Sequence, residues 1–161
     1  MSTATVAAIR DQHYALVEAL TPTSLSGDKF RRFRNEGEAD FPAAMEANPA
    51  GCFRRLQVRQ VGTDEMPEVS NTTEERVRVQ LETRIAYPQT ERFGGANAMD
   101  RDDVINEDWK LVNRAIGIYG RGNFSGTNDC TPLGATMEME RSDGVDYMVV
   151  TSEYEYVRSV T

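Results

Sequence analysis

Apolar and polar residues alternate most regularly between Arg76 and Pro88, in the run RVRVQLETRIAYP. Every second residue from Val77 to Tyr87 is apolar or threonine, and most of the residues between them are charged or polar. A period of two is typical of a β-strand that buries one face. The pattern predicts a strand over residues 74–87 that ends at Pro88, because proline lacks the N–H that pairing requires. One face would pack on a core, while the purpose of the charged face stays open.

Two other segments carry apolar residues at the three- and four-residue spacing of a helix. They cover residues 3–20 and 101–118. The apolar positions are Val6, Ile9, His13, Leu16, Val17 and Leu20 in the first, and Ile105, Trp109, Val112, Ala115 and Ile116 in the second. Asp100 is the predicted N-cap of the second helix, with Asp103 at its third position. Each helix has one apolar stripe, so we expect both to cover the same face of a sheet.

Three shorter runs and one long alternating run predict four more strands, over residues 30–34, 52–61, 135–141 and 145–160. The last two are joined by Ser142-Asp143-Gly144, and Asp-Gly is a strong hairpin signal. Residues 63–73, 89–98 and 121–134 are typical of polar or glycine-rich loops. The order α-β-β-β-α-β-β predicts an α+β fold in one domain over residues 1–161. We expect a mostly antiparallel sheet of about five strands with two helices packed on one face.

Composition limits the classes of partner. The chain has 161 residues and a net charge of −8, which argues against wrapping a nucleic acid, because phosphate binding needs a basic stripe. No run approaches the ~18 apolar residues of a membrane span, and the amphipathic start does not resemble a secretory signal. We therefore expect synthesis in the cytoplasm, no membrane contact, and reduced thiols at Cys52 and Cys130.

Signatures of catalysis are missing from the sequence. The glycine-rich run GIYGRGNFSG follows a helix, whereas a phosphate-binding loop joins a strand to the helix after it. One histidine and two separated cysteines do not form a common zinc site. We predict no catalytic residue, cofactor or metal site. The alternative is a small enzyme or cation site that uses Asp103 and Glu107, four residues apart on one helix face, or His13.

Charge is segregated along the chain. Arginines recur in the predicted strands up to residue 84, while acidic residues gather at the second helix and in the last hairpin. One interpretation is a face exposed to water; the other is a basic face of one subunit that meets an acidic face of the next. The candidate subunit-interface residues are Arg54, Arg59, Arg76, Arg78, Arg84, Glu153 and Glu155.

The element order also resembles a known family. The segments that carry the resemblance are TVAAIRDQHYALVEAL, CFRRLQVRQV, the strand ending TRIAYP, MDRDDVINEDWKLVNRAI and YMVVTSEYEYVRSV. In this order they resemble the tail terminator (tail completion) proteins of long-tailed bacteriophages and related neck proteins, over nearly the whole chain.

The resemblance implies a non-enzymatic virion protein, made in the host cytoplasm, that forms a homo-oligomeric ring, usually a hexamer. The ring would cap the tail tube protein and join the head–tail connector protein, with DNA passing through its lumen without specific binding. Two other hypotheses remain open. One is an acidic binding or inhibitor module that mimics the charge of DNA, and the other is a different head–tail connector or completion protein.

Overall fold

The computed structural model describes residues 6–25, 28–33, 40–71, 74–90, 92–93, 99–118 and 131–159. Several sequence-based predictions fall outside these residues. They concern the helix start at Thr3, the end of the first strand at Arg34, most of the predicted loop over residues 121–134, and Cys130.

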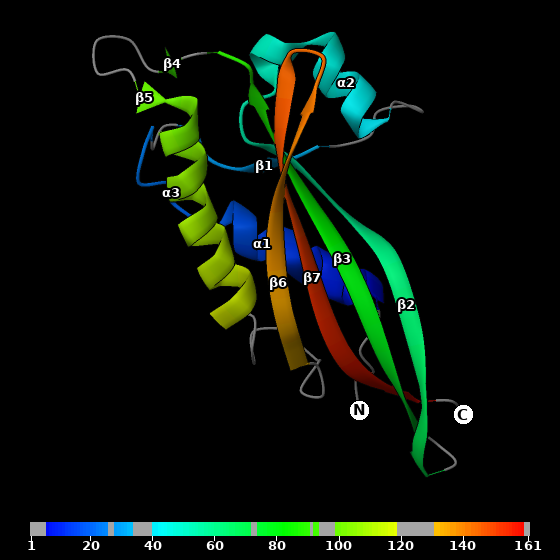
Figure 1. Ribbon diagram of the computed structural model, residues 1–161. Coiled ribbons are helices and arrows are strands. Elements are labelled where there is room, and N and C mark those ends of the chain that lie inside the picture. Colours follow the sequence, from blue (N-terminus) through cyan, green and yellow to red (C-terminus); the bar gives the residue numbers. More distant parts are fainter. Residues whose placement is uncertain are drawn as a thin grey trace.

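Within the described residues, five strands form one twisted sheet in the order β1-β2-β3-β7-β6 (Figure 1). Their bounds are β1 (Arg31–Arg32), β2 (Arg55–Asn71), β3 (Glu74–Pro88), β6 (Thr131–Ser142) and β7 (Val145–Ser159). The short β1 runs parallel to β2, and the other neighbouring pairs are antiparallel. The predicted α+β class with a mostly antiparallel sheet is confirmed.

The strand β2 is longer than its residues predicted. It pairs with β3 as far as Asn71, across most of the predicted polar loop, with register shifts between Gln60 and Gly62 and between Met66 and Asn71. No described strand lies beside the outer edge of β2 after Leu56. An edge strand tolerates polar side chains and even Pro67, because half of its backbone groups need no partner strand. Pairing with the regular strand β3 therefore makes these residues a strand, although their polar composition is typical of a loop.

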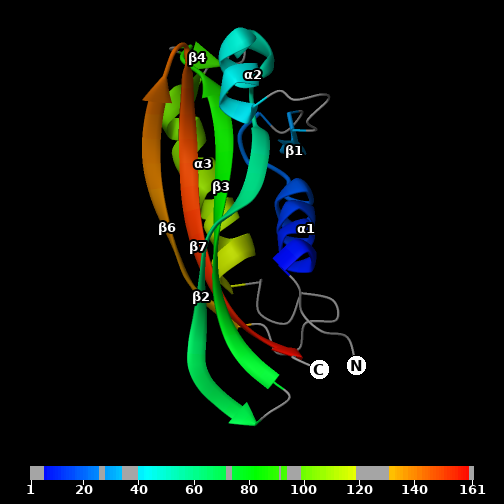
Figure 2. The same ribbon diagram turned by 90° about the vertical axis from the view of Figure 1, so that its right-hand side faces the viewer.

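Two long helices cover the same face of the sheet, as expected. They are α1 (Val6–Glu18) and α3 (Arg101–Asn113), and α3 continues into a π-helical segment, η3 (Arg114–Ile118). Figure 2 shows β6, β7 and β3 in front of α3, with α1 beside them. The pair β4 (Arg92–Phe93) and β5 (Met99–Asp100) leads into α3. Asp100 is at the N-cap, as predicted, but its side chain makes no capping hydrogen bond.

A third helix, α2 (Phe41–Ala47), followed by a 3₁₀ turn, η1 (Pro49–Gly51), packs on the opposite face at one end of the sheet (Figures 1 and 2). Strand alternation explains how both faces are buried there. On β3, Ile85 and Tyr87 face the α1 and α3 side, whereas Ala86 between them contacts the cluster of Phe41 and Met45. Only this end of the second face carries an apolar cluster among the described residues.

The main core lies between the sheet and the long helices. The predicted apolar side of β3 is buried along Val79, Leu81, Thr83, Ile85 and Tyr87. From the helices it receives Ile9, Val17, Val104, Ile105, Val112 and Ile116. None of the helices in the described part of the chain is long and apolar enough to cross a membrane.

Candidate functional site

The most completely bonded polar group in the core is the ion pair between Arg54 and Asp108. Both side chains are fully buried. The Nε atom of Arg54 donates to Oδ2 of Asp108, and one terminal nitrogen donates to Oδ1, each at 2.8 Å. This two-pronged arrangement is the strongest form of a carboxylate–guanidinium contact.

The remaining donors of Arg54 bind a segment that precedes the sheet. They reach the carbonyl oxygens of Ser24, Leu25 and Asp28, each at 2.8 Å. The backbone of Arg54 is left-handed, with φ 57°, and its N–H donates to the carbonyl of Ala86. All five N–H donors of a guanidinium are thus engaged, which accounts for the burial of a permanent charge.

The phenol of Tyr87 completes this cluster by donating to Oδ2 of Asp108 at 2.7 Å. Burial raises the pKa of Tyr87 well above its ordinary value, so the phenol stays protonated as a donor. Burial also raises the pKa of the Asp108 carboxyl, while the bonds from Arg54 and Tyr87 act in the opposite direction. The cluster joins α3, β3, the residue before β2, and Ser24, Leu25 and Asp28.

This cluster corrects two interpretations of the sequence. Arg54 was a candidate for contact with another subunit, but its side chain is closed off inside the core. Asp108 is one of the acidic residues that gather at the second helix, for which one interpretation is a face exposed to water, yet it is buried between Val104 and Val112 on the core side of α3. The sequence does carry a signal for both residues, in their position relative to apolar neighbours. Asp108 has helical spacing to the buried apolar positions of α3. Arg54 lies two residues after Cys52 and two before Leu56, both of which are buried.

Other candidates for subunit contact lie on the second face of the sheet, beyond α2, where they form ion pairs within the chain. Arg59 contacts Glu82 at 3.0 Å, Arg84 contacts the same Glu82 oxygen at 2.6 Å, and Arg84 also reaches Glu140 at 2.6 Å. These residues come from β2, β3 and β6, so the ion pairs run across the sheet. We call this surface the open face: the charged second face carrying Arg59, Glu82, Arg84, Arg78, Glu153 and Glu155.

Arg78 extends the same pattern along β3. Its guanidinium lies 3.6 Å from Glu153 and 3.8 Å from Glu155, both on β7. The side chain of Arg76 is outside the described part of the structure. Arg and Glu residues that are separated along the sequence are therefore interleaved in space. Their contact with another subunit stays a prediction, but it would involve a face whose charges are largely matched within one chain.

The sole histidine belongs to the core. His13 is fully buried, with Nε2 2.9 Å from the Thr83 hydroxyl and Nδ1 3.2 Å from the Tyr154 hydroxyl. Burial lowers its pKa to about 4, so the ring is neutral near pH 7. Asp103 and Glu107 lie instead at the surface of α3, where both line a hollow with Lys110. The structure does not bring His13 to them.

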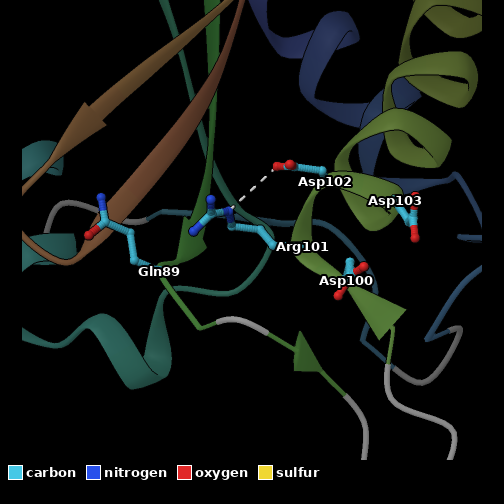
Figure 3. Close-up of a pocket in the computed structure, with 5 residues that line it drawn as sticks. All are labelled: Gln89, Asp100, Arg101, Asp102 and Asp103. Carbon is cyan, nitrogen blue, oxygen red and sulfur yellow. Dashed lines mark ion pairs between the residues drawn. The ribbon is translucent and has the colours of Figure 1, made fainter.

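A second hollow lies where α3 begins (Figure 3). Its described lining residues are Gln89, Asp100, Arg101, Asp102 and Asp103. Arg101 is held by Asp146 at 3.0 Å and by Asp102 at 3.8 Å. Gln89 donates to the same Asp146 at 2.8 Å. The basic side chain in the hollow is thus already bound, and no three potential metal ligands gather among the described residues.

Comparison with known proteins adds no relative: no protein-family model matches the chain, and no curated protein matches it. The fold, the buried cluster and the charged surfaces are therefore the features from which we infer function.

Proposed function

We propose that the protein is a structural subunit of a bacteriophage neck, similar to a tail terminator. Copies would form a ring that caps the tail tube and joins it to the head connector. The resemblance in element order supports this proposal, and the α+β sheet has the expected helices on one face. The chain would act through its surfaces, with no reaction of its own.

The observation that carries the proposal is the open face of the sheet. In Figures 1 and 2, β2, β3 and the end of β7 run on past α2, and no described helix covers their second face there. Antiparallel sheets commonly leave one face uncovered, so this face is available for contact with another subunit. A long, ordered and largely polar sheet surface suits repeated contacts between subunits better than it suits a catalytic cleft.

Charge on this face also suits passage of DNA. The arginines at positions 59, 78 and 84 are each within 4 Å of a carboxylate. Such pairs leave few free cations to hold phosphate groups, and phosphate contacts dominate the affinity of proteins for DNA. With a net charge of −8, a ring of these subunits would let DNA slide through its lumen.

The same interleaving counts against the inhibitor hypothesis. A protein that mimics DNA needs acidic groups arrayed with few cations among them, because it must present the charge of phosphates. Here Glu82 is shared by Arg59 and Arg84, and Glu153 lies beside Arg78. The ring subunit remains the function that we propose.

Deletion of the gene from the phage that encodes it tests this proposal. Electron micrographs of the lysate should show separate heads and tails, with tail tubes longer than normal, and the wild-type gene supplied in trans should restore joined virions. Normal joined virions from the deletion strain would overturn the proposal.

A further inference from the structure

The two lateral edges of the sheet carry charges that the chain itself does not match. At one edge, Arg31 of β1 lies directly beside Arg55 of β2. No described carboxylate forms an ion pair with either residue, and Nε of Arg55 is buried without a hydrogen-bond partner. Like charges side by side on neighbouring strands are unfavourable. We call this pair the basic edge.

Neighbouring basic residues do have partners. Arg32 points to the helix side, where it binds Glu18 at 2.6 Å and stacks over Tyr14. Arg59, farther along β2, binds Glu82. Arg31 and Arg55 are therefore the strand residues at this edge whose charge no described carboxylate matches.

The opposite edge of the sheet is acidic. Glu138 and Glu140 point to the open face from β6, and both are exposed. Glu140 binds Arg84, whereas Glu138 forms no ion pair within the described residues. We call these two residues the acidic edge.

The outer backbone of β6 is also available. The hairpin closes with Ser142 opposite Val145, a pair that exchanges hydrogen bonds in a two-residue turn. Alternation then directs the backbone groups of four residues away from β7. These are Ala135, Met137, Met139 and Arg141. No described strand pairs with them.

The outer edge of β2 is occupied where it follows β1. The hydroxyl of Tyr14 accepts from the N–H of Val58 at 2.8 Å and lies 3.3 Å from its carbonyl oxygen. The carbonyl oxygen of Leu56 accepts from the N–H of Phe33. A neighbour therefore cannot add a strand at these two residues, and can meet this end of the sheet through β1 and the basic edge.

The basic edge and the acidic edge lie at the same position along the strand direction. The strand register places Arg32, Leu56, Ile85, Met148 and Met139 in one row across the sheet. Arg31 and Arg55 precede this row by one residue, and Glu138 and Glu140 lie on either side of it, so alternation directs all four side chains to the second face. A copy displaced sideways, along this row, would bring its basic edge to the acidic edge of its neighbour.

We propose that copies of this chain associate head to tail, with the acidic edge of one copy against the basic edge of the next. Glu138 would face Arg31 and Arg55 across the contact. A contact between two different patches generates a ring when the rotation closes. This inference rests on the proposed ring function and names the surfaces that build the ring.

Charge reversal at each edge tests the contact. Arg31→Glu places a carboxylate opposite Glu138 of the neighbouring copy, and Glu138→Arg places a guanidinium opposite Arg31 and Arg55. Each variant alone should associate at least roughly tenfold more weakly than wild type, because like charges then face each other. An equal mixture of the two variants should assemble again, with acidic and basic copies alternating, as should the double variant Arg31→Glu/Glu138→Arg.

Native mass spectrometry and sedimentation measure these masses. Lys110→Glu and Asp102→Arg are matched controls, because they make the same charge changes on exposed side chains of α3. Both should assemble like wild type, and circular dichroism should show all variants folded.

Two results separate this inference from the function on which it rests. If wild type forms rings that bind tail tubes and both reversed variants do so equally well, the edge contact is wrong and the ring function stands. If wild type remains a monomer alone and with tail tubes, both are wrong. Failure of the mixture to recover would also overturn the pairing of these two edges.

Discussion

Two arginines, Arg54 and Arg84, illustrate opposite uses of the same side chain. Arg54 is fully buried and binds Asp108 together with three carbonyl oxygens. Arg84 lies on the open face, 13% exposed, between Glu82 and Glu140. The guanidinium of Arg54 is stable inside the core only if every donor has a partner, because water cannot reach it. Water can replace the partners of Arg84, because they lie at the surface. Arg54 therefore contributes mainly to the stability of the fold, and Arg84 mainly to the charge of the open face.

The largest effect should follow from Arg54→Met. This change leaves the Asp108 carboxylate buried without its cation, which typically costs about 3–5 kcal/mol. Urea unfolding measured at pH 7 checks it. The double variant Arg54→Met/Asp108→Leu removes both charges and should be more stable than Arg54→Met alone. A double variant that is less stable than the single one would contradict the role assigned to the unpaired charge.

The buried side chain of His13 should make the stability of the protein depend on pH. Its pKa is about 4 in the folded protein and about 6.5 in an unfolded chain. The unfolded state therefore binds a proton first as the pH falls, so stability is complete above pH 6.5 and declines below it. Between pH 6.5 and 5 the free energy of unfolding should fall by about 2 kcal/mol.

The matched control for this prediction is His13→Gln, which cannot titrate. Urea midpoints of the variant should change little over the same interval. An equal decline in both proteins would assign the pH dependence to other groups.

Tyr87→Phe removes one hydrogen bond to Asp108 and keeps the ring in the core. A bond to a charged group contributes about 1.5–3 kcal/mol, and the remaining bonds from Arg54 place the expected loss near the lower end. Thermal unfolding detects a change of this size. A loss of stability no larger than that caused by a surface substitution would show that Arg54 alone supports the carboxylate.

The smallest effect should follow from Arg59→Ala on the open face, because this side chain is 54% exposed and has one acidic partner among the described residues. An exposed ion pair contributes about 0–1 kcal/mol, and added salt screens it. The difference in unfolding free energy from wild type should therefore be below about 1 kcal/mol and shrink in high salt. A loss as large as that of Arg54→Met would erase the distinction between buried and exposed arginines.

The fold was largely predictable because periodicity reports burial directly. Val79 to Tyr87 on the apolar side of β3 are buried as predicted, and the helix stripes pack on the core, with Leu16, Leu20 and Trp109 partly buried. The end of β2 was missed, because its pairing depends on β3 and not on its own polar residues. Local composition does not carry that information.

The charged sites were predictable only in part. Separation along the sequence suggested one basic and one acidic face, but strand register brings Arg78 of β3 to Glu153 of β7. Asp108 could have been found as a charge in apolar phase on a helix. Its partner Arg54 is 54 positions away along the chain, and only the tertiary structure joins them.

The most direct test of a ring-forming neck subunit is the mass of the purified protein, alone and with tail tubes. We expect a closed oligomer, alone or on tubes, with one oligomer bound at the tube end. A protein that stays monomeric at all concentrations and never binds tubes or connectors would contradict the central claim.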